Sequence, residues 1–261
     1  MIRELLKKTP VVGPAAVRVR RALRQRASRK KRQPLPYVFE RIDLDGAADA
    51  ADRCLRQLSN LLNYTKTSGA WYSAVRYPAG YHTIEINGQR ITGQRDPAHR
   101  LDAAPFDFRG KTVLDIGCNQ GGMLLRLADR LEWGIGIDYD SRMVNAANRI
   151  KSVRQANNLH FYVFNLEKEP LDLIRDFIPR PKVDIVFLLA VCAWIDNWQA
   201  VINFAATLSD VMLFETTGTD EQQIQHEQYL REVFARVECL AATSDDDAIQ
   251  KKRRLLFCTK S

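Results

Sequence analysis

The stretch that decides the fold is KTVLDIGCNQGGMLLRLADR, residues 111–130. It opens with an apolar run, TVLDI, which predicts a buried strand, and it closes with apolar residues at helical spacing, which predict a helix. Between the two lies a turn that contains Gly117, Gly121 and Gly122. A glycine turn between a strand and a helix leaves backbone N–H groups bare, and this arrangement is typical of ligand-binding α/β folds.

Strand and helix patterns alternate from this stretch to the end of the chain. Predicted strands cover residues 112–116, 134–138, 160–164, 184–189, 211–215, 237–242 and 254–258, and predicted helices cover 122–131, 141–155, 198–208 and 221–234. Such alternation predicts a doubly wound α/β fold. Only a loop separates the last two strands, so we expect a seven-stranded, mostly parallel sheet with an antiparallel hairpin at one edge.

The part of the chain before this α/β region has a different pattern. Residues 46–63 have apolar side chains at a spacing of three to four, which predicts a helix. Residues 82–92 alternate around Asn87-Gly88, which predicts a hairpin because both turn residues must adopt positive φ. We therefore expect three parts: a basic N-terminal arm over residues 1–33, an accessory helix and hairpin lid over 34–105, and the α/β domain over 106–261.

The glycine turn lacks one residue that a dinucleotide needs. The phosphate-binding fingerprint of dinucleotide folds would place glycines at positions 117, 119 and 122, and position 119 is Asn. The Asn119 side chain stands where a pyrophosphate would lie, so the turn suits a nucleoside ligand without phosphates. Asp138 ends the next predicted strand, 21 residues after Gly117 (138 − 117). A carboxylate at about this distance accepts hydrogen bonds from both ribose hydroxyls.

Four motifs together resemble the class I S-adenosylmethionine-dependent methyltransferases: VLDIGCNQGG, GIGIDYD, FYVFNLE and VDIVFLLAV. The resemblance covers residues 106–261 and implies a Rossmann-like domain with S-adenosylmethionine as its cofactor. It implies that the methionine part of the cofactor lies along Asp115, Gly117, Cys118 and Asn119, with a close approach at Gly121. It implies that Asp138 holds the ribose, that Tyr139 lies beside the adenine, and that Asn165 and Leu166 contact the adenine. It further implies that Ala190 and Val191 lie at the sulfur. Two carboxylates have alternative roles: Asp115 as a cap of the turn, and Asp138, or its neighbour Asp140, as the N-cap of the helix from Ser141.

The acceptor side of the site is less well marked. The resemblance supplies no general base, because the region after the fourth predicted strand reads AVCAWIDNW, without a histidine. The catalytic candidates are Asp196, which alternatively caps the following helix, and His82, which alternatively is a half-buried hairpin residue. An aromatic and arginine-rich lid suits a small-molecule or glycan acceptor. The substrate-binding candidates are Trp71, Tyr72, Tyr81, Gln94 and Arg95 in the lid, together with Trp194. Five cysteines without a C-x-x-C pair predict neither a disulfide framework nor a metal site.

The positive charge of the chain lies at its N-terminus. Residues 1–32 hold 12 Lys/Arg and one Glu, a net charge of +11, whereas the whole chain carries +8, which leaves −3 for the remainder. We expect this arm to contact anionic lipid headgroups at a membrane surface, or RNA. The sequence has no run of about 18 apolar residues and no apolar signal segment at its start. These features favour a cytoplasmic protein held peripherally at the inner membrane.

The leading hypothesis is an O-methyltransferase that acts on a glycan or glycolipid precursor at the membrane surface. An RNA methyltransferase is the first alternative. The approach to the glycine turn, with its GQRD, is similar to the wobble-uridine tRNA methyltransferase group, and DIGCNQG followed by LAVCAWIDNW is similar to the RNA-cap γ-phosphate methyltransferase group. The mildly acidic body argues against RNA, since RNA-binding faces are usually basic. The second alternative is an S-adenosylmethionine-binding scaffold without catalysis.

Overall fold

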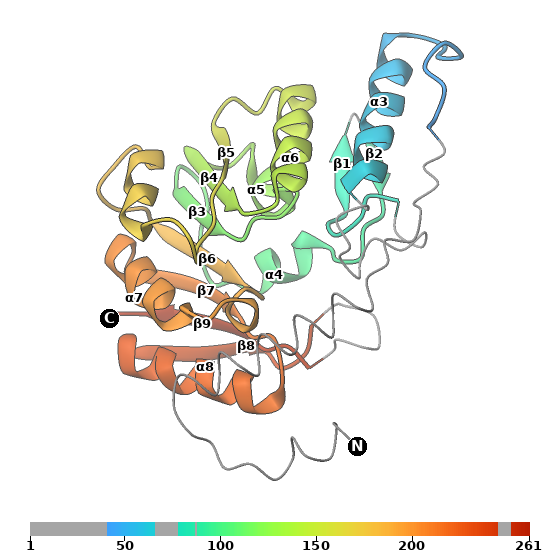
Figure 1. Ribbon diagram of the computed structural model, residues 1–261. Helices are drawn as coiled ribbons and strands as arrows, with labels where there is room; N and C mark the ends of the chain where they lie inside the picture. The colour runs from blue at the N-terminus through green and yellow to red at the C-terminus, as the bar shows by residue number, and fades with distance from the viewer. Residues whose placement is uncertain (1–40, 66–77, 87, 245–251) are drawn as a thin grey trace, which may run out of the picture. The chain divides into compact units, whose positions relative to one another are not determined.

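A seven-stranded sheet forms the centre of the α/β region. The computed structural model describes residues 41–65, 78–86, 88–244 and 252–261. The strands are β3 (Thr112–Ile116), β4 (Trp133–Asp138), β5 (Leu159–Val163), β6 (Ile185–Leu189), β7 (Val211–Glu215), β8 (Arg236–Ala241) and β9 (Leu255–Thr259). They lie in the order β5-β4-β3-β6-β7-β9-β8, and β9 runs antiparallel to both of its neighbours, β7 and β8 (Figure 1). The other neighbouring pairs are parallel, so the predicted sheet with its antiparallel edge hairpin is confirmed.

Helices connect the strands where the sequence predicts them. α5 (Gly122–Leu127) follows β3, α6 (Ser141–Arg154) follows β4, and α7 (Trp198–Leu208) and α8 (Asp220–Val233) follow β6 and β7. The first of these is shorter than predicted, because beyond Leu127 the bonds of Ala128 and Arg130 tighten to an i→i−3 spacing. In the described part of the chain, no helix is long and apolar enough to cross a bilayer.

Three further helical segments escape the sequence pattern. They are α4 (Pro97–Ala103), η3 (Leu171–Phe177) and η4 (Cys192–Trp194), the last two being 3-10 helices. Each has seven residues or fewer, which is too short for a helical periodicity to appear. The start of α4 does carry a local signal, because the Asp96 side chain accepts a hydrogen bond from Ala98 N–H and Pro97 occupies the first turn.

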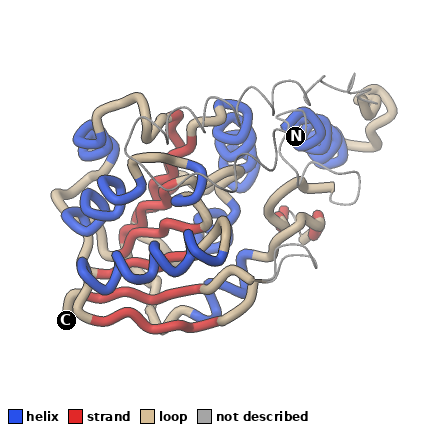
Figure 2. Tube along the Cα trace, turned by 60° about the horizontal axis from the view of Figure 1, so that its bottom comes forward, coloured by secondary structure: helices blue, strands red, loops and turns tan. Residues whose placement is uncertain are grey.

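Alternation along the strands divides the core into two layers, one on each face of the sheet. Val113, Phe187 and Leu213 belong to one hydrophobic cluster, which includes residues of α5 and α6. Their neighbours in the strands belong to a second cluster, which includes residues of α7 and α8. Figure 2 shows helices on both sides of the strands. Because side chains alternate with a period of two, Asp115 and Glu215 point to the same face as Val113 and Leu213.

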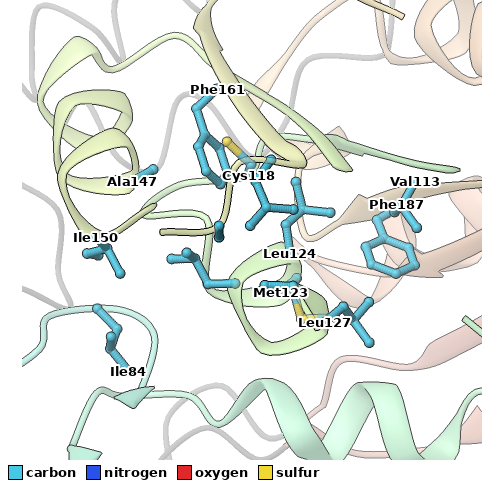
Figure 3. Packing of buried hydrophobic residues seen from close by; sticks show 14 of the residues in the cluster. Ile84, Val113, Cys118, Met123, Leu124, Leu127, Ala147, Ile150, Phe161 and Phe187 are labelled. Carbon is cyan, nitrogen blue, oxygen red and sulfur yellow. The ribbon is translucent and has the colours of Figure 1, made fainter. Parts of the chain in front are cut away.

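The accessory segment contributes to the first of these clusters. Its elements are α3 (Ala50–Thr65) and the antiparallel hairpin of β1 (Ile84–Ile86) and β2 (Gln89–Ile91), as the sequence predicts. Leu58 and Leu62 of α3 and both isoleucines of β1 lie in the cluster with α5 and α6. Figure 3 draws Ile84 and Ile150 of α6 in this cluster. The accessory segment and the α/β region therefore share one hydrophobic layer.

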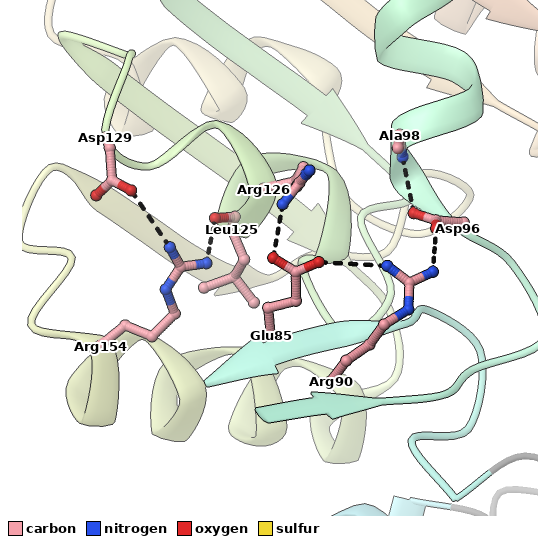
Figure 4. Close-up of polar contacts among 8 residues, drawn as sticks. All are labelled: Glu85, Arg90, Asp96, Ala98, Leu125, Arg126, Asp129 and Arg154. Atoms are coloured by element: carbon pink, nitrogen blue, oxygen red, sulfur yellow. Dashed lines mark hydrogen bonds and ion pairs between the residues drawn. The ribbon is translucent and has the colours of Figure 1, made fainter. Parts of the chain in front are cut away.

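A polar network on the surface joins the hairpin to α4 and α5. Glu85 of β1 accepts hydrogen bonds from Arg126 of α5 at 2.7 Å and from Arg90 of β2 at 3.3 Å (Figure 4). Arg90 also pairs with Asp96, the N-cap residue of α4. These side chains are largely exposed, and exposed ion pairs contribute only about 0–1 kcal/mol each. The network therefore orients the hairpin relative to α4 and α5 more than it stabilises the fold.

Gln120, in the glycine turn, makes a buried connection to the accessory segment. Its side chain is fully buried, donates to Thr65 Oγ1 at 3.0 Å and accepts from the Tyr81 N–H at 3.2 Å. We expect Gln120→Ala to lower the free energy of unfolding by about 1–3 kcal/mol, because it removes a hydrogen-bond partner of the buried Thr65 hydroxyl and of the partly buried Tyr81 N–H. Urea denaturation measures the change. Gln57→Ala, which removes an exposed contact with Arg149, is the control. Equal losses for the two variants would show that Gln120 does not anchor this segment.

Candidate functional site

The turn between β3 and α5 is held in a conformation that requires glycine. Gly117 and Gly121 have φ values of 80° and 72°, in the left-handed region. A Cβ on Gly117 would lie 2.4 Å from Val191 Cγ2, and one on Gly121 would lie 2.5 Å from the ring of Phe161. Asn119 also has a left-handed φ, 52°, which Asn adopts more readily than most residues. Packing and backbone geometry therefore require glycine at positions 117 and 121, so no side chain covers the backbone there.

Asp138, the last residue of β4, orders this turn. Its Oδ2 accepts a hydrogen bond from the Asn119 N–H and its Oδ1 accepts one from the Asp140 N–H, both at 2.9 Å. A carboxylate has about four acceptor positions, so capacity remains for ribose hydroxyls. Burial raises the pKa of Asp138 to about 6, against the effect of the N–H groups that it accepts from. The N-cap of α6 is Asp140, whose side chain accepts from Arg142 N–H, so Asp138 does not have that role.

Two buried opposite charges lie near the carboxyl end of β3. Asp115 of β3 is 2% exposed and Arg100 of α4 is 3% exposed. Among the described residues, Asp115 Oδ2 and Arg100 Nε and Nη2 have no hydrogen-bond partner. The two side chains interact electrostatically without forming an ion pair. Buried polar atoms in native proteins are nearly always satisfied, so this arrangement indicates a ligand with complementary groups. A zwitterionic amino-acid end, with an ammonium for Asp115 and a carboxylate for Arg100, has these groups.

The ionisation of Asp115 gives a testable pH dependence. Burial raises its pKa from the ordinary value of 3.8 to about 7, Arg100 opposes this shift, and Asp138 adds to it. Between about pH 4 and pH 7 the folded protein retains a proton that the unfolded chain releases, so this group's contribution to the free energy of unfolding falls as the pH rises. We expect ligand-free Asp115→Asn to gain stability relative to the wild type over this window. Thermal unfolding across the pH series measures the difference.

Asp107 provides the control for that series. It is an exposed carboxylate whose pKa is lowered by hydrogen bonds from Arg109, so it is already ionised above about pH 4. The free energy of unfolding of Asp107→Asn should therefore change with pH in the same way as that of the wild type between pH 4 and pH 7. If the stability of Asp115→Asn also changed with pH in the same way as that of the wild type, the assignment of a raised pKa to Asp115 would be contradicted.

A second buried cluster lies at the carboxyl end of β7. Glu215 accepts two hydrogen bonds from Arg95, each at 2.6 Å, and both side chains are almost fully buried. Arg253, which precedes β9, has its Nη1 3.9 Å from Glu215 Oε2. Burial raises the pKa of Glu215, but the charges of Arg95, Arg100 and Arg253 outweigh it and hold the pKa below its ordinary value. Glu215 is therefore ionised and ties the accessory segment to the sheet.

The remaining residues predicted for the cofactor follow the carboxyl ends of β3, β4, β5 and β6. Val191 packs against Gly117, and Ala190 before it has a left-handed φ of 58°. A non-glycine residue in this region costs about 1–3 kcal/mol and is frequent at functional sites. The others are Cys118, which is buried, Tyr139, which is 73% exposed, and Asn165 and Leu166, which form part of the loop after β5.

The acceptor-side candidates occupy different environments. His82 is buried, with its ring where a Cβ on Gly122 would lie, and burial followed by the charges of Arg100 and Arg95 holds its pKa well below 6.5. Asp196 is exposed, and the N-cap residue of α7 is Asn197, so the alternative role of Asp196 as this cap is wrong. Trp194 is 71% exposed, and Tyr81 and Gln94 are half-buried. Arg95 is buried and donates hydrogen bonds to Glu215. Trp71 and Tyr72 lie outside the described residues.

Three residues of the site have roles or contacts that the sequence does not predict. The sequence places Arg100 only among the charged residues of the lid segment and gives it no role at the cofactor, because α4 has no visible periodicity, although Asp96-Pro97 marks its start. Arg253 lies beside a predicted edge strand, and nothing in its local pattern connects it to Glu215. Gln120 stands inside the glycine motif but makes its contacts with residues far away in the sequence. These relations are tertiary, and a single sequence does not encode them locally.

The family of the chain follows from comparison with known proteins. Residues 107–249, more than half of the chain, match the family described as "Methyltransferase domain". The chain belongs to this methyltransferase family. The predicted class I, Rossmann-like fold is confirmed, and the cofactor of this methyltransferase is S-adenosylmethionine.

Individual relatives match parts of the methyltransferase. The chain is 32% identical over 121 residues to the U6 snRNA methylphosphate capping enzyme Amus of Drosophila melanogaster, an alignment that covers 41% of this chain and 40% of that enzyme. The chain therefore spans less than half the length of this curated relative. Among solved structures, it is similar to the N-terminal domain of EvdMO1 with SAH bound (TM-score 0.54, 16% identity, covering 68% of this chain and 90% of the other). It is also similar to the bifunctional kinase-methyltransferase WbdD (TM-score 0.55, 17% identity, 76% and 46%). At these identities the two structures show the fold.

Proposed function

We propose that this methyltransferase holds S-adenosylmethionine at the β3–α5 turn and methylates an oxygen of a glycan or glycolipid precursor at a membrane surface. The observation that carries the cofactor placement is the buried, unpartnered pair of Asp115 and Arg100. Asp115 receives the ammonium of the methionine part, and Arg100 receives its carboxylate. Asp138, with its free acceptor capacity, receives the ribose.

The remaining cofactor residues have supporting roles in this proposal. The bare backbone at Gly117, Cys118 and Gly121 lets the methionine part approach closely, and Asn119 stands where a dinucleotide would need glycine. We assign the others their roles by the strand that each follows: Tyr139, Asn165 and Leu166 contact the adenine, and Ala190 and Val191 lie near the sulfur.

The cofactor supplies an electrophilic methyl group on a positively charged sulfur. The chain's own residues orient the acceptor oxygen in line with that methyl group and exclude water. A base is required only when the acceptor is a neutral hydroxyl. In that case His82, which is neutral and buried, and Asp196, which is exposed after η4, are the candidates to take the proton.

Support for a glycan acceptor comes from the aromatic character of the accessory segment and of η4. Trp194 is 71% exposed at the end of η4, and an exposed indole offers a flat apolar face for a sugar ring. Tyr81 and Gln94 add polar groups, and we assign Trp71 and Tyr72 the same role from the sequence. The net charge of +11 in residues 1–32 would place the enzyme at an anionic membrane surface.

An RNA acceptor is the second candidate. It is favoured by the 32% identity over 121 residues to an snRNA methylphosphate capping enzyme. The basic arm also suits RNA, since phosphate contacts supply most of non-specific RNA affinity. The net charge of −3 outside the arm argues against this candidate.

Transfer of a labelled methyl group distinguishes the candidates. The protein is incubated with labelled S-adenosylmethionine and either a lipid-linked glycan extract or total small RNA. We expect label in the lipid-linked fraction that resists ribonuclease. Ribonuclease-sensitive label would instead establish the RNA candidate. Label in neither fraction, from protein shown to bind the cofactor, would indicate a non-catalytic scaffold. Flotation with anionic liposomes tests the arm: deletion of residues 1–32 should abolish it.

A further inference from the structure

His82 carries two buried nitrogen atoms that have no hydrogen-bond partner. The residue is 3% exposed, and both Nδ1 and Nε2 are unpartnered among the residues that the structure describes. Buried polar atoms in native proteins nearly always have a partner, so this ring indicates a group that binds beside it. Burial, together with the charges of Arg100 and Arg95, holds the pKa of His82 well below 6.5. The ring is therefore neutral and has one N–H donor and one acceptor nitrogen.

The main chain and the ring of His82 both contact the glycine turn between β3 and α5. Its backbone N–H donates to Gln120 Oε1 at 3.5 Å, and the same oxygen accepts from the Tyr81 N–H at 3.2 Å. A Cβ on Gly122, the first residue of α5, would lie 2.4 Å from His82 Cγ and 2.7 Å from its Nδ1. The imidazole is therefore packed directly against the end of the turn, and glycine at position 122 leaves the space that the ring fills.

Arg100 connects this ring to Asp115. Among the charges that act on His82 and on Asp115, that of Arg100 has the largest effect on each. The unpartnered atoms of Arg100 are Nε and Nη2, which form one edge of the guanidinium group, and such an edge binds both oxygens of a carboxylate. A carboxylate accepts about four hydrogen bonds, so it has room for another donor beside Arg100. The unpartnered Oδ2 of Asp115 is left for an ammonium group.

We infer that His82 is a cofactor-binding residue whose ring N–H donates a hydrogen bond to the carboxylate of the methionine part, beside Arg100. This inference rests on the proposed function, which assigns that carboxylate to Arg100. A neutral imidazole adds a donor without adding a further positive charge next to a cofactor whose sulfur is already positive. A ring engaged by the cofactor does not take a proton from the acceptor, so Asp196 remains of the two candidates for that step.

Calorimetric titration of SAH and of decarboxylated SAH into the full chain tests the inference, because the two ligands differ only in the carboxylate. We expect the wild type to bind SAH more tightly. His82→Leu should weaken SAH binding at least about tenfold, the loss of one hydrogen bond to a charged group, and should change the affinity for decarboxylated SAH by less than about twofold. His99→Leu is the matched control, because His99 is exposed on α4 and should leave both affinities unchanged. His82→Phe keeps a ring against Gly122 and decides the question if the leucine variant does not fold.

The outcomes separate this inference from the proposed function. Equal affinities of the wild type for the two ligands would overturn the assignment of the carboxylate to Arg100, and with it the cofactor placement in the proposed function. A preference for SAH that is the same in the wild type and in the His82 variants would overturn the inference alone, because the ring nitrogens would then bind something other than the carboxylate. Equal weakening of both ligands would assign His82 to the fold and would also overturn the inference alone.

Discussion

Replacement of Arg95 by alanine is expected to lower the free energy of unfolding by about 3–5 kcal/mol. The substitution would leave the Glu215 carboxylate buried without the two hydrogen bonds of 2.6 Å that it accepts from Arg95. Arg253 lies at 3.9 Å and replaces neither bond. Urea denaturation followed by circular dichroism measures the loss. The accessory segment should also become susceptible to proteolysis at lower urea concentration than the sheet.

Two comparisons make this result interpretable. Arg90→Ala removes exposed ion pairs with Glu85 and Asp96 and should cost less than about 1 kcal/mol. The double variant Arg95→Met, Glu215→Leu removes both charges together and should recover much of the lost stability, because the penalty arises from the unpaired carboxylate. If Arg95→Ala were as mild as Arg90→Ala, the buried pair would not hold the accessory segment on β7.

Replacement of Asp138 by alanine is expected to weaken S-adenosylmethionine binding by about 1.5–3 kcal/mol, or roughly 10- to 150-fold in Kd. The substitution removes the proposed partner of the ribose hydroxyls and also releases the Asn119 N–H, which loosens the turn. Calorimetry with SAH measures the change. Because the pKa of Asp138 is raised to about 6, wild-type affinity should also fall as the pH drops through 6 and the carboxylate is protonated.

A substitution at the neighbouring carboxylate, Asp140, tests whether a loss of SAH binding in Asp138→Ala arises from a loss of stability. Asp140→Ala removes the N-cap of α6 and should cost about 1 kcal/mol of stability. Its side chain has no place in the proposed ribose contact, so the Kd for SAH should stay within about twofold of the wild type. Parallel losses of affinity in both variants would mean that Asp138 acts by stabilising the loop rather than by holding the ribose.

The sheet was predictable because its signals are local and repeated. Apolar runs such as TVLDI mark each buried strand, and the helices between them are long enough to show their period, as in Trp198–Leu208. The turn residues were predictable for a similar reason: glycine at 117 and 121 satisfies a backbone requirement that the sequence shows directly. Asp138 followed from its spacing in the motif.

The polar part of the site was predictable only in fragments. Arg95 and Glu215 were each visible as charged residues, but their pairing spans 120 residues and depends on how the accessory segment folds onto the sheet. Arg100 lies in a helix too short to show a period, and no local signal marks the burial of His226 against Trp198. Burial of charge is a property of the assembled fold, so the residues most important for electrostatics carried the weakest sequence signals.

The most direct test of the central claim is a calorimetric comparison of SAH with a nicotinamide dinucleotide on the purified wild-type protein. We expect one-site binding of SAH and no measurable heat from the dinucleotide, because position 119, where the dinucleotide fingerprint has glycine, is Asn. Absence of heat from SAH, or tighter binding of the dinucleotide, would contradict it.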